Sequence, residues 1–164
     1  DLAMEIATRA KVPLKIAAKV DKVDTAYFEN TIEPLLKCPN VDYIGEINDV
    51  DKDDFLGNAL ALLFPIDWPE PFGLVMIEAM ACGTPIIASP SGAVPEIMSS
   101  DTGYIVEGVE DAVAAVEKAR NFDRRRCRLA FEEKFTAMRM AKDYLALYDR
   151  VQSLMPKLPE LVGS

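Results

Sequence analysis

Short apolar runs alternate with helical segments along the first two thirds of the chain, and this alternation restricts the fold more than any other feature. The apolar runs are bounded by Gly, Pro or polar residues, which is typical of strands. Strands that alternate with helices form a parallel sheet, because parallel neighbours need a long crossover connection. We therefore predict an α/β, Rossmann-like parallel sheet with helices on both faces. The predicted strands lie at 14–17, 41–44, 59–65, 85–89 and 103–106.

Apolar residues at helical spacing predict the helices between these strands. The predicted helices cover residues 2–10, 25–36, 49–58, 74–81 and 94–98, and the last third of the chain is helical. Two apolar stripes there, from Ala112 to Phe122 and from Met140 to Val151, indicate helix faces that pack against a partner. Arg124–Arg126 and Arg128 precede Glu132 and Glu133 at helical pairing distance, which predicts a solvated, ion-paired face.

Length and composition favour one globular domain, which we place at residues 1–155 with a loose tail at 156–164. The net charge of -9 argues against nucleic acid as a partner, since a phosphate-backbone binder needs a basic face. Three cysteines without metal-like spacing indicate a reducing, cytoplasmic setting. The chain has no histidine, the commonest general base, and no run long enough to span a bilayer.

Two carboxylates, Glu70 and Glu78, flank the predicted start of the helix at 74–81, with Gly73 between them. A carboxylate can accept paired hydrogen bonds from a sugar diol, and free amides at a helix start can receive a phosphate. The spacing is therefore compatible with a binding site for a nucleotide sugar. On spacing alone, an ordinary helix cap with two surface carboxylates is the simpler alternative.

The residues around these glutamates carry a family resemblance. The stretch from Phe64 to Ala88 closely resembles the donor-binding signature of retaining family 4 glycosyltransferases. The match continues through Ser91–Ile97 and Thr102–Val106, and Val41–Ile47 resembles the strand that precedes the nucleobase pocket. The resemblance implies the C-terminal, donor-binding half of a GT-B enzyme, which has two Rossmann-like domains with the active site between them.

The resemblance also implies roles for individual residues. Glu70 is the predicted catalytic residue and would hold hydroxyls of the donor hexose. Phe72, Gly73 and Leu74 would present backbone amides to the donor sugar and phosphate, and Glu78 would bind the ribose diol. Neither glutamate is placed convincingly as an attacking nucleophile, so the resemblance instead implies stabilisation of the leaving diphosphate.

The nucleobase is expected to contact Ile47, with Asn48 and Asp49 as weaker candidates. The donor would be a UDP- or GDP-linked sugar, and neither the base nor the sugar follows from the motif. No cofactor and no metal are expected, and the acidic run Asp51–Asp54 is interpreted as a charged helix start. The other partner would be an N-terminal acceptor domain of the same protein. Peripheral attachment to the inner membrane face through that domain is an alternative to a purely cytoplasmic location.

Three departures from the family pattern shape the expectations. The first strand of this half, with its phosphate-binding arginine and lysine, should precede Asp1, and its absence would leave a gap between the strands at Ile16 and Leu63. The acceptor domain is also absent, so the isolated chain is predicted to be inactive and open to self-association. Ala17–Lys19 replaces the usual glycine-rich turn. The alternatives are half of a related GT-B synthase, phosphorylase or epimerase, or a non-catalytic nucleotide-sugar-binding or interaction module.

Overall fold

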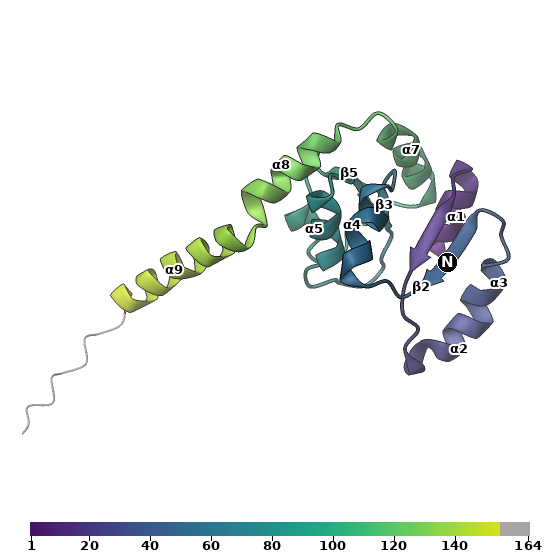
Figure 1. Cartoon of the computed structure of the whole chain (residues 1–164), viewed down its shortest axis with the longest axis horizontal. Coiled ribbons are helices and arrows are strands. Elements are labelled where there is room, and N and C mark those ends of the chain that lie inside the picture. Colours follow the sequence, from purple (N-terminus) through teal and green to yellow (C-terminus); the bar gives the residue numbers. More distant parts are fainter. Residues whose placement is uncertain (155–164) are drawn as a thin grey trace, which may run out of the picture.

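The computed structural model describes residues 1–154, whose strands are parallel and flanked by helices (Figure 1). The chain begins with α1 (Leu2–Ala10), β1 (Leu14–Ala17), the helical segments η1 (Lys22–Asp24), α2 (Thr25–Tyr27), η2 (Phe28–Ile32) and α3 (Glu33–Leu35), then β2 (Val41–Gly45) and α4 (Asp49–Gly57). It continues with β3 (Leu62–Phe64), α5 (Leu74–Ala81), β4 (Ile86–Ala88), α6 (Val94–Ile97), β5 (Gly103–Ile105), α7 (Val109–Ala119), α8 (Arg124–Lys134) and α9 (Ala137–Leu154). The α/β fold is confirmed.

Within residues 1–154, five strands form two separate sheets. β1 pairs with β2, Leu14 opposite Val41, and the second sheet has the order β3-β4-β5. β1 and β3 are not hydrogen-bonded to each other, and a cavity of about 720 Å³ lies between them, lined by residues of both strands and of α4 and α7. The predicted gap between Ile16 and Leu63 is therefore present.

The largest difference between predicted and observed strand length is at β3. The prediction of a buried strand over 59–65 is wrong in extent, because only Leu62–Phe64 is extended and all three residues are half-buried. β3 pairs with β4 on one side only, and its other edge borders the cavity.

The core consists of two clusters, one on each face of the β3-β4-β5 sheet, because successive side chains of β4 point to opposite faces. Ile86 and Ala88 belong to a cluster with buried residues of α5 and α6, and Phe131 of α8 packs against it. Ile87 belongs to a second cluster with α1 and α7. This second cluster buries the apolar stripe of α7, as predicted, and α1 packs directly on α7. The helices on both faces thus hold the carboxyl ends of β3 and β4 in place.

The arginine cluster does not form the predicted solvated face throughout. Arg126 pairs with Asp101 and Arg128 with Glu132, but the half-buried Arg124 turns inward. Its guanidinium donates hydrogen bonds of 2.7 Å to the carbonyl oxygens of Gly57 and Ala59 and of 2.7 Å to Thr84 Oγ1. The prediction was wrong for Arg124 because helical spacing reveals only partners on the same helix.

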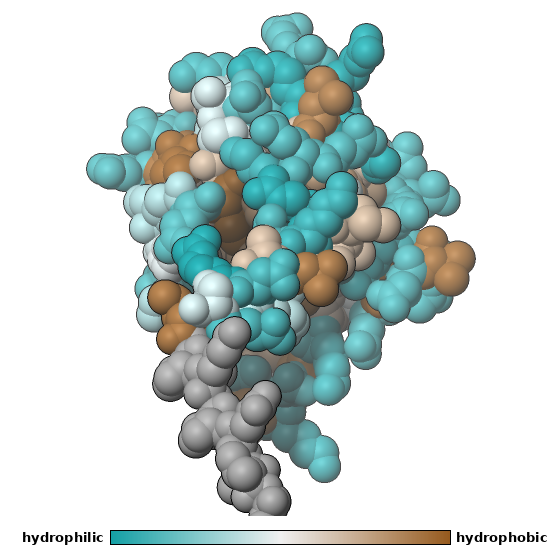
Figure 2. Space-filling view, turned by 90° about the vertical axis from the view of Figure 1, so that its left-hand side faces the viewer, coloured by the Kyte–Doolittle hydropathy of each residue, from teal (hydrophilic) through white to brown (hydrophobic). Residues whose placement is uncertain are grey.

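Helix α9 extends away from the rest of the molecule (Figure 1), and none of its residues is buried. The prediction that its apolar stripe packs against a partner is wrong. In the view that faces α9, separate hydrophobic groups stand out on a largely hydrophilic surface (Figure 2). No helix within residues 1–154 is long and apolar enough to cross a membrane. Self-association stays a prediction, and the tail predicted at 156–164 lies outside the described residues.

Candidate functional site

Glu70 lies in the loop between β3 and α5, at the carboxyl edge of the sheet, where open α/β sheets bind ligands. Its Oε1 accepts hydrogen bonds from the amides of Gly73 at 3.0 Å and Phe72 at 3.5 Å. Its Oε2 accepts a hydrogen bond of 3.1 Å from the indole Nε1 of Trp68. The carboxylate therefore caps the start of α5. The alternative of an ordinary helix cap, which the spacing alone favoured, thus describes part of the role of Glu70.

These donors also fix the charge of the Glu70 carboxylate. The indole N–H of Trp68 is the main cause that holds the pKa of the carboxyl below its usual range, and the amides of Phe72 and Gly73 add to the effect. A carboxyl with a lowered pKa is ionised at neutral pH and can only accept hydrogen bonds. Trp68 itself is 54% exposed, so its ring flanks the loop without being buried in it.

The loop after β4 supports the loop that carries Glu70. The amide of Ala93 donates a hydrogen bond of 2.8 Å to the Glu70 carbonyl oxygen, and Ser91 Oγ donates one of 3.3 Å to the carbonyl of Ile66. Gly92 has φ +56°, and a Cβ placed on it would lie 2.2 Å from the Glu70 carbonyl oxygen. Only glycine permits this close approach of the two loops.

Helix α5 begins at a left-handed Gly73 with φ +75°. The amide of Gly73 is taken by Glu70, whereas the amides of Leu74 and Val75 have no acceptor within residues 1–154. Phe72 and Leu74 are 41% and 65% exposed, so the chain at the very start of the helix is open to solvent. Free amides and the positive end of a helix dipole are suited to an anion such as a phosphate.

Glu78 lies on α5 itself and is engaged by a lysine that the sequence analysis did not single out. Its Oε1 accepts a hydrogen bond of 3.0 Å from Lys52 Nζ on α4. Lys52 also pairs with Asp49 at 3.1 Å. The acidic run at the start of α4 concealed Lys52, because the pattern there indicates only a charged helix start; an isolated cation within that run was the available signal.

The predicted nucleobase contact is connected to Glu78 through α4. Ile47 is half-buried and lies just after β2, two residues before α4 begins. Asn48 caps α4, because its Oδ1 accepts hydrogen bonds from the amides of Val50 and Asp51 at 2.9 and 3.0 Å. Asn48 and Asp49 thus serve the helix start and the ion pair with Lys52, and the base-binding role of Ile47 stays a prediction.

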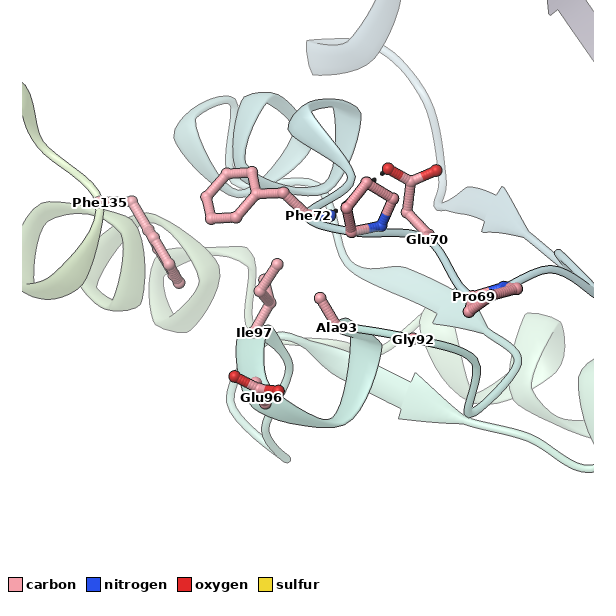
Figure 3. Close-up of a pocket in the computed structure, with 9 residues that line it drawn as sticks. Pro69, Glu70, Phe72, Gly92, Ala93, Glu96, Ile97 and Phe135 are labelled. Carbon is pink, nitrogen blue, oxygen red and sulfur yellow. Dashed lines mark hydrogen bonds between the residues drawn. The ribbon is translucent and has the colours of Figure 1, made fainter.

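A cavity of about 470 Å³ lies beside the Glu70 loop, but it does not join the two glutamates. Figure 3 shows Phe72, Ile97 and Phe135 around it, while the Glu70 carboxylate is turned toward the start of α5. Glu78 is not among its lining residues, and Glu96 lies at its rim. The cavity is therefore a hollow of mixed polar and apolar lining, to which Glu70 contributes and Glu78 does not. Within residues 1–154, no group of three or more acidic or cysteine side chains is arranged to hold a metal ion.

Cys82 and Cys127 do not contribute a reactive group to this site. Burial raises the pKa of the Cys127 thiol to about 11, and burial is also the first cause that raises the pKa of Cys82, with Asp53 beside it. A raised thiol pKa lowers the fraction of thiolate, which is the nucleophilic form. The groups at this site that can bind a ligand are the carboxylates of Glu70 and Glu78, the Lys52 ammonium and the backbone amides at the start of α5.

Comparison with known proteins identifies relatives along most of the chain. A family model described as "Glycosyl transferases group 1" matches residues 3–130. N-acetyl-alpha-D-glucosaminyl L-malate synthase of Bacillus anthracis is 31% identical over 151 residues, which are 85% of this chain and 39% of that protein. A GDP-mannose-dependent monoacylated alpha-(1-6)-phosphatidylinositol monomannoside mannosyltransferase of Corynebacterium glutamicum is 33% identical over 109 residues, or 59% of this chain and 29% of that protein.

Solved structures share the fold. A glycosyltransferase involved in avilamycin A biosynthesis aligns with a TM-score of 0.78 at 22% identity, over 94% of this chain and 48% of that one. Anabaena HepE in complex with UDP and glucose aligns with a TM-score of 0.72 at 15% identity, over 90% of this chain and 44% of that one. The chain therefore spans less than half the length of each of these proteins.

Proposed function

The chain belongs to the group 1 glycosyltransferases, and on this premise we propose that it is the half of a retaining hexosyltransferase that binds the nucleotide-sugar donor. Its fold fits the C-terminal domain of a GT-B glycosyltransferase. The observation that carries the proposal is the attachment of both glutamates to one helix. Glu70 is hydrogen-bonded to Gly73, the N-cap residue of α5, and Glu78 is part of α5.

In this proposal the donor lies along the start of α5. Glu70 accepts hydrogen bonds from the hexose, and the free amides of Leu74 and Val75 receive the diphosphate. Glu78 accepts hydrogen bonds from the two hydroxyls of the ribose diol, and Ile47 contacts the base. The backbone of Phe72 and Gly73 lies beside the donor sugar and phosphate. The protein holds and orients the donor in this scheme, and no metal or other cofactor takes part.

Transfer needs an acceptor, which we assign to an N-terminal domain of the same protein. The acceptor hydroxyl forms the new bond to the anomeric carbon on the face from which the diphosphate leaves, and its proton passes to the departing phosphate. Because the chain spans 39% of its Bacillus anthracis relative, we expect the 164 residues alone to bind donor without catalysing transfer.

Titration of the 164-residue chain with nucleotides tests this proposal. UDP, GDP, ADP and their glucose and mannose conjugates should be compared by NMR, which detects millimolar affinities. We expect saturable binding to a uridine or guanosine diphosphate and its sugar, with ADP weaker. If none of these ligands binds at concentrations of several millimolar, the proposed function is wrong.

A further inference from the structure

Lys52 links the helix that follows the predicted base-binding loop to the helix that carries Glu78. Its Nζ lies 3.0 Å from Glu78 Oε1 and 3.1 Å from Asp49 Oδ1. The side chains of Lys52 and Glu78 are each 35% exposed, whereas that of Asp49 is 95% exposed. The contact with Glu78 is therefore better shielded from water and salt than the contact with Asp49.

Glu78 depends on this contact for its orientation. Within residues 1–154, Lys52 is the only side chain that hydrogen-bonds or ion-pairs with the Glu78 carboxylate. A glutamate has several rotatable bonds, and fixing them has an entropic cost that a ligand must otherwise meet. An ammonium held 3.0 Å away restricts the carboxylate before any ligand arrives.

We infer that Lys52 is a positioning residue, whose ammonium holds the Glu78 carboxylate in the orientation that accepts the ribose diol. This inference rests on the proposed function, because it takes Glu78 as the ribose ligand. The two carboxylate oxygens have about four acceptor sites between them, and Lys52 occupies one on Oε1. Both hydroxyls of a ribose can therefore bind while the ion pair is intact.

The surroundings of Lys52 make it a stable support. It lies in the first turns of α4, where Asn48 caps the helix. The side-chain Nδ2 of Asn48 donates a further hydrogen bond of 2.8 Å to Asp51 Oδ2. The backbone beneath Lys52 is thereby fixed to the end of the loop that contains Ile47. Through Lys52, the predicted base contact and the predicted ribose contact keep a constant relative position.

A comparison of two ligands separates positioning from simple charge attraction. UDP and 2′,3′-dideoxy-UDP carry the same diphosphate, but only UDP presents the diol; the guanosine pair replaces them if the wild-type chain prefers GDP. By NMR titration, we expect Lys52→Met to weaken binding of the ribonucleotide about tenfold, the effect of one charge-assisted hydrogen bond. The dideoxy ligand should lose less than about twofold, which is within the exposed-charge effect expected for the diphosphate.

Two further variants serve as controls. Lys52→Arg keeps a cation that can donate to Glu78 and should retain most of the affinity for the ribonucleotide. Lys142→Met makes the same change in net charge on the exposed face of α9, and should leave both affinities unchanged.

A ligand-free measurement tests the ion pair itself. The hydrogen bond to Glu78 is the first cause that raises the pKa of the Lys52 ammonium, and Asp49 adds to it. Glu78→Gln should therefore lower the pKa of Lys52, as measured by NMR titration of its side chain. An unchanged pKa means that the pair does not form in solution and overturns the inference.

The remaining outcomes are also decisive. Equal losses for the two ligands in Lys52→Met, or no loss for either, overturn the inference and leave the proposed function standing. Equal affinity of the wild-type chain for both ligands overturns it as well, because Glu78 then does not bind the ribose diol. A wild-type chain that binds no nucleotide removes the proposed function, and the inference with it.

Discussion

Gly92→Ala is expected to lower the free energy of unfolding by about 3 kcal/mol or more and to abolish measurable donor binding. The new Cβ would lie 2.2 Å from the carbonyl oxygen and 2.4 Å from the amide nitrogen of Glu70. Both are backbone atoms, so no side-chain rotation relieves the clash, and the loop that carries Glu70 must move. Urea denaturation measures the stability, and NMR titration with the nucleotide sugar measures the binding.

Gly45→Ala is the matched control for this substitution. Gly45 also has a left-handed backbone, with φ +74°, but a Cβ placed there meets nothing within 4 Å. It should therefore show only the backbone strain of a left-handed alanine, about 1 to 2 kcal/mol. If the two variants are equally stable, the close packing of the loops after β3 and β4 does not hold the site together.

Arg124→Met should destabilise the chain by about 3 to 5 kcal/mol, since it removes three hydrogen bonds from a charged donor and leaves their acceptors unpaired. The guanidinium joins the end of α4, the residues before β3 and the turn before β4, through Gly57, Ala59 and Thr84. Thr84 is fully buried, and its hydroxyl donates a hydrogen bond of 2.7 Å to the carbonyl of Leu56. The midpoint of urea denaturation, at constant slope, reports the change.

The neighbouring arginine provides the control for Arg124. Arg125 is exposed, and its guanidinium has no hydrogen-bond or ion-pair partner within residues 1–154. Arg125→Met should change stability by less than about 0.5 kcal/mol. An Arg124→Met protein as stable as Arg125→Met would show that the inward hydrogen bonds do not hold α4, β3 and β4 together.

Elements with strong local signals could be predicted from the sequence. The apolar run at Ile86–Ala88 and the apolar helix Leu74–Ala81 form as expected, because the strand is buried on both faces and the helix buries one apolar face. Apolar periodicity and spacing placed the two glutamates at the start of one helix, and the family resemblance added their predicted roles in binding the donor. The gap beside β3 followed from the strand that the family pattern requires.

Long-range contacts could not be predicted from these patterns. Arg124 reaches residues 65 and 67 positions away, and Lys52 reaches Glu78 across 26 positions. The hydrogen bond from Trp68 to Glu70 is local, but it depends on the loop conformation rather than on periodicity. Apolar periodicity in α9 indicated a buried face, yet the pattern contains no information about whether a neighbour is there.

The most direct test of the donor site is a map of the backbone amide shifts caused by a bound nucleotide sugar, in the wild-type chain and in Glu78→Gln. The account predicts the largest shifts at 72–75, smaller ones at Ile47 and around Glu78, and binding weakened tenfold to about a hundredfold in Glu78→Gln. Shifts centred on Ile97 and Phe135, or unchanged affinity in Glu78→Gln, would contradict the assignment of the donor to α5.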